Sequence, residues 1–275
     1  MDANDLFDVR DKVALVTGGA SGLGYAFASI LADCGAAVYV ADRDTERLDA
    51  VAGELEGASG LALDVGDGQA VQAAVDGIVA RHGRIDIAFA NAGVARGTPP
   101  LVSSGSIDEF GWDDYRGLLD VNLHGVVYTV RAAAKHMKQK RSGSIVVTAS
   151  TAGLRNDPFV PYSYAIAKAG VVNFMKQAAH DLARWNVRVN AIAPGPFKTN
   201  LGRPRPAAEP ATPAPVDAQR EDRWNAVIPL GRMGDPSEIR GLALLLASDA
   251  SSFMTGGVYP IDGGALLQGP SLPLP

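Results

Sequence analysis

The chain has 275 residues, 47% of them hydrophobic, which is enough to bury the core of one large domain. Its formal net charge of -5, without a basic patch, argues against nucleic acid and anionic membranes as partners. Cys34 is the single cysteine, so no disulfide can form within the chain. The N-terminal segment lacks the apolar stretch of a signal peptide, and no apolar run approaches the roughly 20 residues of a membrane span. We therefore expect a cytoplasmic protein.

Short apolar runs alternate with helix-periodic segments along the first 90 residues. The runs predict buried strands at residues 12–17, 37–41, 61–63 and 85–90. The intervening segments predict helices at residues 22–34, 44–55 and 69–82. Continuous apolar strands separated by helices are typical of a parallel sheet that is covered by helices on both faces.

The second half continues the alternation after a loop rich in Gly, Pro and Ser at residues 93–111. Helices are predicted at residues 112–138, 162–185 and 235–246, and strands at residues 144–148, 187–192 and 257–261. Closely spaced prolines predict a substrate lid at about residues 197–227, and the tail at 266–275 is predicted to be irregular. With no repeat and no second-domain boundary, residues 1–275 are predicted to form a single α/β domain, a doubly wound Rossmann fold of about seven parallel strands.

A glycine-rich turn follows the first strand and opens the first helix. Its sequence is Thr-Gly-Gly-Ala-Ser-Gly-Leu-Gly at positions 17–24. Glycines let the chain turn tightly and let the backbone approach a pyrophosphate, which the free N–H groups of the helix N-terminus then face. A tight turn without a ligand is the alternative. The order of strand, glycines and helix favours a dinucleotide site lined by Gly18, Ser21, Gly22, Leu23 and Gly24.

An acidic residue, Asp42, ends the second strand 24 residues after Gly18. A carboxylate here accepts hydrogen bonds from the ribose hydroxyls of adenosine and repels a 2′-phosphate, which favours NAD over NADP. Arg43 follows immediately and is able to bind such a phosphate, so NADP is the less favoured alternative. Asp42 could instead be the N-cap of the next helix, a role that Asp44 could also fill.

A hydroxyl, a phenol and an amine come close together in the sequence after the strand at 144–148. They belong to Ser150, Tyr164 and Lys168. Tyr164 and Lys168 are four residues apart, so they share one face of a helix. An ammonium about 4 Å away would lower the pKa of a phenol from its usual value of about 10 and permit proton transfer near neutral pH. The alternative is an incidental pair on the surface.

Taken together, these motifs resemble those of the short-chain dehydrogenases/reductases over about residues 9–265. The other matching pieces, in the family's order, are Asp64-Val65, Asn91-Ala92-Gly93, Asp120-Val121-Asn122-Leu123, Pro194-Gly195 with Thr199, and Asp262-Gly263-Gly264. The resemblance implies an oxidoreductase that transfers a hydride between NAD(H) and a small secondary alcohol or ketone. It also implies the catalytic tetrad Asn122, Ser150, Tyr164 and Lys168.

The resemblance extends to the cofactor site. It implies that Gly18, Gly22 and Gly24 line the pyrophosphate, that Asp42 binds the adenosine ribose, and that Asp64 and Val65 contact adenine. Asn91 and Gly93 would lie under the cofactor, and Pro194, Gly195, Phe197 and Thr199 would hold the nicotinamide. Lys168 would bind the nicotinamide ribose beside Tyr164, and Asn122 would hold a water that links Lys168 to solvent. This chemistry requires no metal.

The position of the serine departs from the family pattern. The family usually places it 13 residues before the tyrosine, where this chain has Thr151. Ser150 nevertheless begins the local pattern Ser-x-x-Gly, which ends at Gly153. We therefore infer a one-residue insertion near Asn156-Asp157-Pro158 and take Ser150 as the catalytic serine, with Thr151 as the alternative.

The substrate pocket is predicted from residues that flank the tetrad and the lid. They are Arg96, Leu154, Arg155, Asn156, Tyr162, Pro196 and Trp224. Leu154, Phe197 and Trp224 indicate an apolar, cyclic or aryl contact surface. Arg155, Arg203 and Arg205 would instead suit a substrate that carries a carboxylate. The sequence therefore leaves both kinds of substrate open.

The family resemblance also implies a homotetramer built on the helices at 112–138 and 162–185. Apolar residues beyond one face of these helices agree with it: Val126, Val127, Val130, Val171, Val172 and Phe174. The alternative function is an NADPH-dependent carbonyl reductase of the 3-oxoacyl type. That enzyme should have a basic residue in place of Asp42 and a basic surface for an acidic carrier, and neither is evident in the sequence.

Overall fold

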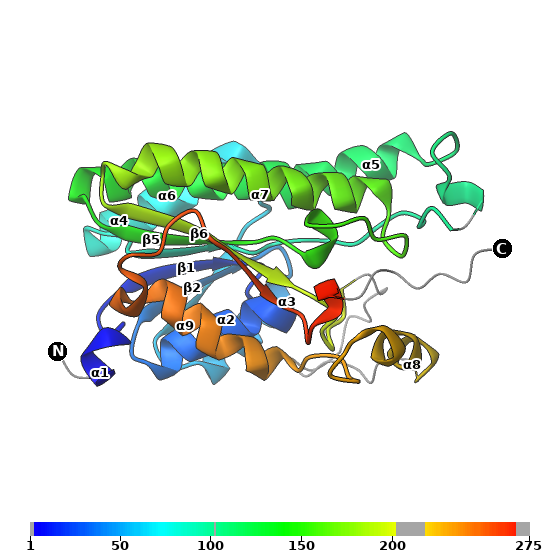
Figure 1. Cartoon of the computed structure of the whole chain (residues 1–275). Helices are drawn as coiled ribbons and strands as arrows, with labels where there is room; N and C mark the ends of the chain where they lie inside the picture. The colour runs from blue at the N-terminus through cyan, green and yellow to red at the C-terminus, as the bar shows by residue number, and fades with distance from the viewer. Residues whose placement is uncertain (1–2, 102, 202–217, 268–275) are drawn as a thin grey trace.

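The computed structural model describes residues 3–101, 103–201 and 218–267. Its centre is a seven-stranded parallel sheet with the strand order β3-β2-β1-β4-β5-β6-β7 (Figure 1). The strands are β1 (Val13–Thr17), β2 (Ala37–Asp42), β3 (Ala58–Ala62), β4 (Ile87–Ala90), β5 (Gly143–Thr148), β6 (Val187–Pro194) and β7 (Val258–Ile261). The prediction of a doubly wound sheet of about seven strands is confirmed.

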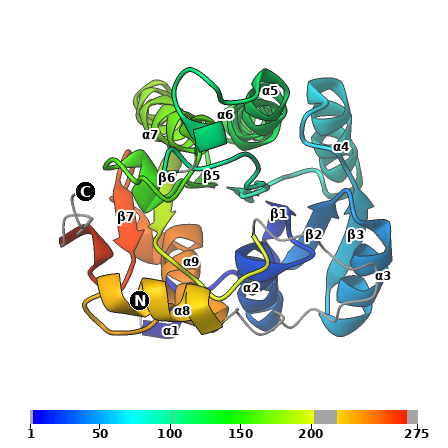
Figure 2. The ribbon, with the colours of Figure 1, turned by 90° about the vertical axis from the view of Figure 1, so that its right-hand side faces the viewer.

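Helices cover both faces of the sheet (Figure 2). One face carries α4 (Gly68–His82), α5 (Trp112–Leu119), α6 (Gly125–Lys140) and α7 (Tyr162–Ala183), and the other carries α2 (Gly22–Asp33), α3 (Thr45–Glu54) and α9 (Arg240–Ala247). Successive side chains of a strand point to opposite faces, so each strand contributes residues to two hydrophobic cores, one on each face of the sheet. In β1, Leu15 packs in the core under α4, α6 and α7, whereas Ala14 and Val16 pack in the core under α2, α3 and α9.

Several element boundaries differ from the sequence prediction. Strand β3 lies at Ala58–Ala62 instead of 61–63, because an edge strand with half-buried and exposed residues has a weak apolar pattern. The single helix predicted at 112–138 is interrupted by a π-helical turn, Asp120–His124. The helix predicted at 235–246 begins with a 3₁₀ turn, Pro236–Ile239, ahead of α9.

Two short helices were not predicted. One is α1 (Ala3–Leu6), and the other is α8 (Ala218–Val227), which belongs to the predicted lid at 197–227. Residues 202–217 of that lid, and 268–275 of the predicted irregular tail, lie outside the described residues. Residues 265–267 of the tail region form a 3₁₀ turn. No helix in the described part of the chain is long and apolar enough to cross a membrane.

The strand order reverses between β1 and β4, which pair side by side through Ala14 with Ile87 and Val16 with Phe89. From β1 the chain proceeds outward to β2 and β3, and then returns to β4 on the other side. In doubly wound sheets, ligands bind at the carboxyl ends of the strands where the order reverses. The turn after β1 and the segment after β4 are therefore the places where a site is expected.

Candidate active site

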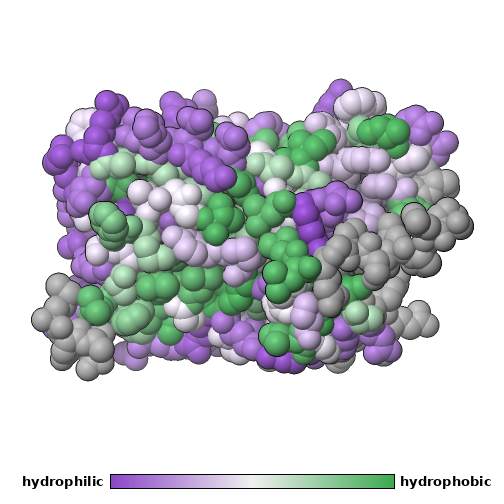
Figure 3. Space-filling model, viewed as in Figure 1, coloured by the Kyte–Doolittle hydropathy of each residue, from purple (hydrophilic) through white to green (hydrophobic). Residues whose placement is uncertain are grey.

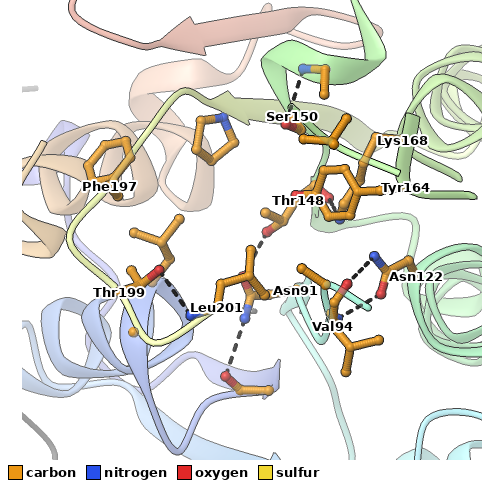
Figure 4. A pocket seen from close by; sticks show the side chains of 18 of the residues that line it. Asn91, Val94, Asn122, Thr148, Ser150, Tyr164, Lys168, Phe197, Thr199 and Leu201 are labelled. Carbon is orange, nitrogen blue, oxygen red and sulfur yellow. Dashed lines mark hydrogen bonds between the residues drawn. The ribbon is translucent and has the colours of Figure 1, made fainter. Parts of the chain in front are cut away.

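A cavity of about 550 Å³ opens at the carboxyl ends of the strands (Figure 4). It is lined by every residue predicted to bind the cofactor: Gly18, Ser21, Gly22, Leu23, Gly24, Asp42, Arg43, Asp64, Val65, Asn91, Gly93, Tyr164, Lys168, Pro194, Gly195, Phe197 and Thr199. The predicted tetrad of Asn122, Ser150, Tyr164 and Lys168 lines the same cavity. The structure therefore brings together residues that are up to 181 positions apart in the sequence, from Gly18 to Thr199.

The turn between β1 and α2 is shaped by glycines. Gly18 and Gly22 have φ values of +64° and +55°, which favour glycine. A Cβ on Gly18 would lie 2.7 Å from the Ala92 Cα, and one on Gly24 would collide with the carbonyl oxygen of Gly18. A Cβ on Gly22 would instead occupy the space beside the Thr199 side chain, at 3.5 Å. The turn thus leaves the N-terminus of α2 open to the cavity, as a pyrophosphate requires.

The Asp42 carboxylate is held at the end of β2 by two backbone amides. Its Oδ2 accepts the Ala20 N–H at 3.3 Å, and its Oδ1 accepts the Asp44 N–H at 3.2 Å. The N-cap of α3 is Asp44, whose side chain accepts the Arg47 N–H. The alternative role of Asp42 as the N-cap is therefore excluded, and its carboxylate lies in the cavity lining.

Asn91 ties the ends of three strands together. Its Nδ2 donates to the Thr17 carbonyl at 3.0 Å and to the Gly18 carbonyl at 3.3 Å, while its Oδ1 accepts the Thr148 hydroxyl at 2.9 Å. The Thr17 hydroxyl in turn accepts the backbone N–H of Asn91 at 3.0 Å. These bonds hold the glycine turn against β4 and β5. Thr148 was not predicted to belong to the site, although its position at the end of β5, two residues before Ser150, indicates that it lies at the same edge of the sheet.

Lys168 is buried on α7 and points at the end of β5 (Figure 4). Its Nζ donates to the Thr148 carbonyl at 2.8 Å, and burial lowers the pKa of the amine to about 8. Gly93 keeps the adjoining space open, because a Cβ there would lie 3.8 Å from the Lys168 Nζ and 3.6 Å from the Asn122 Oδ1. Lys168 therefore carries its positive charge at neutral pH.

Asn122 is fully buried in the π-helical turn, and its side chain binds the chain segment after β4. Its Oδ1 accepts the Val94 N–H at 2.7 Å, and its Nδ2 donates to the Val94 carbonyl at 2.8 Å. Both amide atoms thus hold the wall of the cavity in place (Figure 4). That Asn122 also holds a water stays a prediction.

The Tyr164 phenol faces Ser150 inside the cavity (Figure 4). Burial raises the pKa of Tyr164, a hydrogen bond with Ser150 opposes this rise, and the negative charge of Asp157 adds to it. The expected lowering of this pKa by Lys168 is therefore not seen here. The physical reason is that the phenol is buried, while the Lys168 Nζ is directed at the Thr148 carbonyl and lies 5.8 Å from the centroid of the Tyr164 ring.

The serine that hydrogen-bonds Tyr164 is Ser150, the residue favoured by the Ser-x-x-Gly pattern. Its Oγ also accepts the Ala152 N–H at 3.2 Å, which caps the 3₁₀ turn Thr151–Gly153. Gly153 allows this turn to pack on α7, because a Cβ there would lie 2.6 Å from the carbonyl carbon of Lys168. Thr151 is buried and also lines the cavity. The contact between Ser150 and a substrate stays a prediction.

Known proteins resemble this chain over nearly its whole length. A family model described as enoyl-(acyl carrier protein) reductase matches residues 18–265. A 3-oxoacyl-(acyl-carrier-protein) reductase of Thermotoga maritima is 37% identical over 263 residues, covering 94% of this chain and 99% of the relative. A cyclohexanol dehydrogenase of a Rhodococcus species is 38% identical over 281 residues, covering 94% of this chain and 98% of the relative.

A solved structure agrees with these relatives. It is a gluconate 5-dehydrogenase of Burkholderia cenocepacia in complex with NADP and tartrate, 34% identical, with a TM-score of 0.85 over 98% of this chain and all of that chain. The chain belongs to the short-chain dehydrogenase/reductase family. It is therefore an oxidoreductase, and the resemblance identified from the motifs is confirmed.

The substrate end of this short-chain dehydrogenase/reductase differs in part from the prediction. Arg96, Arg155, Pro196 and Trp224 line the cavity. Leu154, Asn156 and Tyr162, which were also predicted, are not among its lining residues; Leu154 and Asn156 are exposed, and the Tyr162 ring packs on Phe110 with their centroids 5.9 Å apart. Leu154 and Asn156 lie in the irregular turn before α7, so sequence proximity to Ser150 does not decide which side chains point inward. Arg203 and Arg205 lie outside the described residues.

Other lining residues were not predicted from the sequence. They are chiefly apolar: Val94, Ala95, Ala152, Phe159, Val160, Pro161, Leu201, Val227, Met233 and Ala265. Asp157, in the turn before α7, also lines the cavity. In the described part of the chain, no three His, Cys, Asp or Glu side chains group as metal ligands would.

Proposed function

We propose that this enzyme transfers a hydride between NAD(H) and a secondary alcohol or ketone, with Tyr164 as the acid/base. The observation that carries the proposal is the juxtaposition of Ser150, Tyr164 and Lys168 in one cavity with the glycine turn. The phenol is hydrogen-bonded to Ser150, and the buried ammonium lies on the same helix. This arrangement suits proton exchange with a hydroxyl while a hydride moves on the other side of the carbinol carbon.

The residues present fit a dinucleotide. The open N-terminus of α2 and the space that a Cβ on Gly22 would fill suit the pyrophosphate, and Asp42 suits the adenosine ribose. Thr199, beside Gly22, and Phe197 line the same cavity, and the nicotinamide is proposed to bind against them. A bound nicotinamide supplies the hydride acceptor in oxidation and the donor in reduction.

In alcohol oxidation, Tyr164 is proposed to take the hydroxyl proton as the carbinol carbon loses its hydride. Ser150 orients the substrate oxygen by hydrogen bonding. The positive charge of an oxidised nicotinamide bound beside Tyr164 would favour its phenolate form. In reduction, Tyr164 gives the proton back to the carbonyl oxygen. Asn122 fixes the Val94 segment of the cavity wall by two hydrogen bonds.

NAD is proposed as the cofactor in preference to NADP. The carboxylate of Asp42, which two backbone amides hold in place, would repel a 2′-phosphate. Arg43 lines the cavity beside it and supports the alternative, an NADPH-dependent carbonyl reductase of the 3-oxoacyl type. The Thermotoga relative named above is such a 3-oxoacyl reductase, and the Burkholderia structure contains NADP. The anchored acidic residue leads us to favour NAD.

A homotetramer and a cytoplasmic location complete the proposal. Four of the six apolar residues first assigned to the interface, Val126, Val130, Val171 and Val172, are buried in the chain's own core. The stronger support is a surface on which apolar residues gather over β7 and α9 (Figure 3). Strand β7 is at the edge of the sheet, and edge strands are usually covered. Light scattering at micromolar concentration tests this assembly, and a mass near 28.6 kDa would contradict it.

Steady-state assays test the proposed reaction. Purified enzyme is assayed with NAD⁺ and with NADP⁺ against cyclic, aryl and sugar alcohols, and in the reverse direction with the matching ketones. We expect turnover of at least one secondary alcohol, with kcat/KM higher for NAD⁺. The absence of turnover with every alcohol and ketone would refute the reaction, and a preference for NADP⁺ would favour the alternative.

A further inference from the structure

Among the described residues, a single acidic side chain lines the substrate end of the cavity. Asp157 belongs to the turn between the 3₁₀ helix Thr151–Gly153 and α7, and it lines the cavity together with Ser150 and Tyr164. The other acidic residues among the described lining, Asp42 and Asp64, belong to the adenosine end. Asp157 also belongs to the segment in which the spacing from Ser150 to Tyr164 led us to infer a one-residue insertion.

The local backbone holds the carboxylate in place. The Asp157 Oδ1 accepts the Phe159 N–H at 3.0 Å, which forms an Asx turn that fixes the side chain at the cavity wall. The side chain is half-buried, and its negative charge acts on the buried Tyr164 phenol. The charge of Asp157 therefore acts on the Tyr164 phenol within the same cavity. The cationic lining residues at this end are Arg96 and Arg155 at the mouth and Lys168 behind the phenol.

The wall on which Asp157 lies is largely apolar. Phe159, two residues further on, packs edge-to-face on Trp224 of α8 with a centroid distance of 5.8 Å. Trp224 also packs on Ile228, Met233 and Ala265. The wall therefore offers a hydrocarbon surface beside one carboxylate. A substrate that covers this wall removes water from Asp157, and an ionised carboxylate without a partner is costly to bury.

We propose that Asp157 is a specificity-determining residue that accepts a hydrogen bond from a second hydroxyl next to the carbinol, so that the preferred substrates are vicinal diols on an apolar ring and their hydroxyketones. The inference rests on the proposed function. A carboxylate only accepts hydrogen bonds, so it matches a hydroxyl and repels a substrate carboxylate. A site built to bind a substrate hydroxyl rejects the analogue that lacks it strongly, because the polar group of the site is then left unpaired.

A matched pair of alcohols tests the inference. The enzyme is assayed with NAD⁺ and either cyclohexanol or trans- and cis-1,2-cyclohexanediol, which differ from cyclohexanol only in the second hydroxyl. We expect kcat/KM for the better diol to exceed that for cyclohexanol by about tenfold or more, in line with a hydrogen bond to a charged group. The Asp157→Asn variant should lose most of this ratio, because its amide oxygen still accepts the Phe159 N–H while the charge is gone.

Two comparisons make the result decisive. Asp113→Asn removes an exposed carboxylate at the start of α5, outside the cavity lining, and should leave the diol ratio unchanged. If the enzyme turns over cyclohexanol as well as either diol, and if Asp157→Asn leaves that ratio unchanged, the inference is overturned while the proposed function stands. A larger preference for 2-aminocyclohexanol or for 2-hydroxycyclohexanecarboxylate would also overturn it, in favour of an ammonium or a carboxylate substrate. Loss of turnover with all of these alcohols would instead refute the proposed function.

Discussion

At the cofactor end of the cavity the glycine turn acts through its backbone, whereas at the substrate end the lining residues act through their side chains. The glycine turn at residues 17–24 works through positive φ angles and through the absence of Cβ atoms. The substrate end instead depends on how Asp157, Phe159 and Trp224 are directed, and these come from two separate segments of the chain.

The difference explains why the two ends tolerate change differently. A backbone site needs particular residues only where a side chain would collide, so its sequence requirements are strict and local. A side-chain site can be changed by altering a surface turn, such as the one after Ser150, without disturbing the strands beneath it. Tyr164, the proposed acid/base, lines the cavity together with residues of both ends, so we expect its loss to have the largest effect.

Removing the phenolic oxygen should have the largest effect on turnover. We expect Tyr164→Phe to lower kcat by about 10²–10⁴-fold, the usual contribution of a general acid/base. Binding of NADH, measured by fluorescence titration, should change little because the glycine turn and Asp42 are untouched. Turnover retained at the wild-type level would rule out the proposed role of Tyr164, and loss of NADH binding as well would indicate a disturbed fold.

A methyl group in the glycine turn should disrupt the cofactor end while leaving the catalytic side chains in place. A Cβ on Gly24 collides with the Gly18 carbonyl oxygen and approaches the Asn91 amide, so Gly24→Ala should lower the free energy of unfolding by about 1–3 kcal/mol and weaken NADH binding. Chemical denaturation with and without NADH measures both. The matched control is Gly77→Ala in α4, where a Cβ meets nothing within 4 Å and should stabilise the helix by about 0.5–1 kcal/mol. If Gly24→Ala and Gly77→Ala had equal effects on stability and on NADH binding, the glycine turn would not depend on the absence of a Cβ at Gly24.

The contrast between the two ends also shows what could be predicted from the sequence. The strands and the glycine turn were predicted because their signals are contiguous: apolar runs, and glycines that directly follow one of them. The positions of Leu154, Asn156 and Tyr162 were not, because the direction of a side chain in an irregular turn depends on long-range packing. The network through Thr148 and Asn91 joins strands that are neighbours only in the folded sheet, and the π-helical turn that directs Asn122 has no local signature in its composition.

Cofactor choice should change when the anchored carboxylate is removed. Asp42→Ala eliminates the negative charge that disfavours a 2′-phosphate and leaves Arg43 in place, so the ratio of kcat/KM for NAD⁺ to that for NADP⁺ should fall by about 10–100-fold. The control is Asp44→Ala, which removes the N-cap of α3 and should cost about 1 kcal/mol of stability without changing that ratio. An unchanged ratio in Asp42→Ala would undo the argument for NAD.

The smallest expected effect is a shift in the pH dependence of oxidation, and it separates the charge of Asp157 from its shape. The charge of Asp157 adds to the rise in the Tyr164 pKa that burial causes, so replacing it with Asn should lower that pKa. Oxidation needs the phenolate, so the rising limb of kcat against pH should move to lower pH in Asp157→Asn. Asp157→Glu keeps the charge and should leave the limb near its wild-type position. Lys168 limits the range of the measurement, since burial lowers its pKa to about 8 and its charge declines above that pH. A limb that moves equally in both variants would mean that Asp157 acts on Tyr164 through packing of the turn, with its charge playing no part.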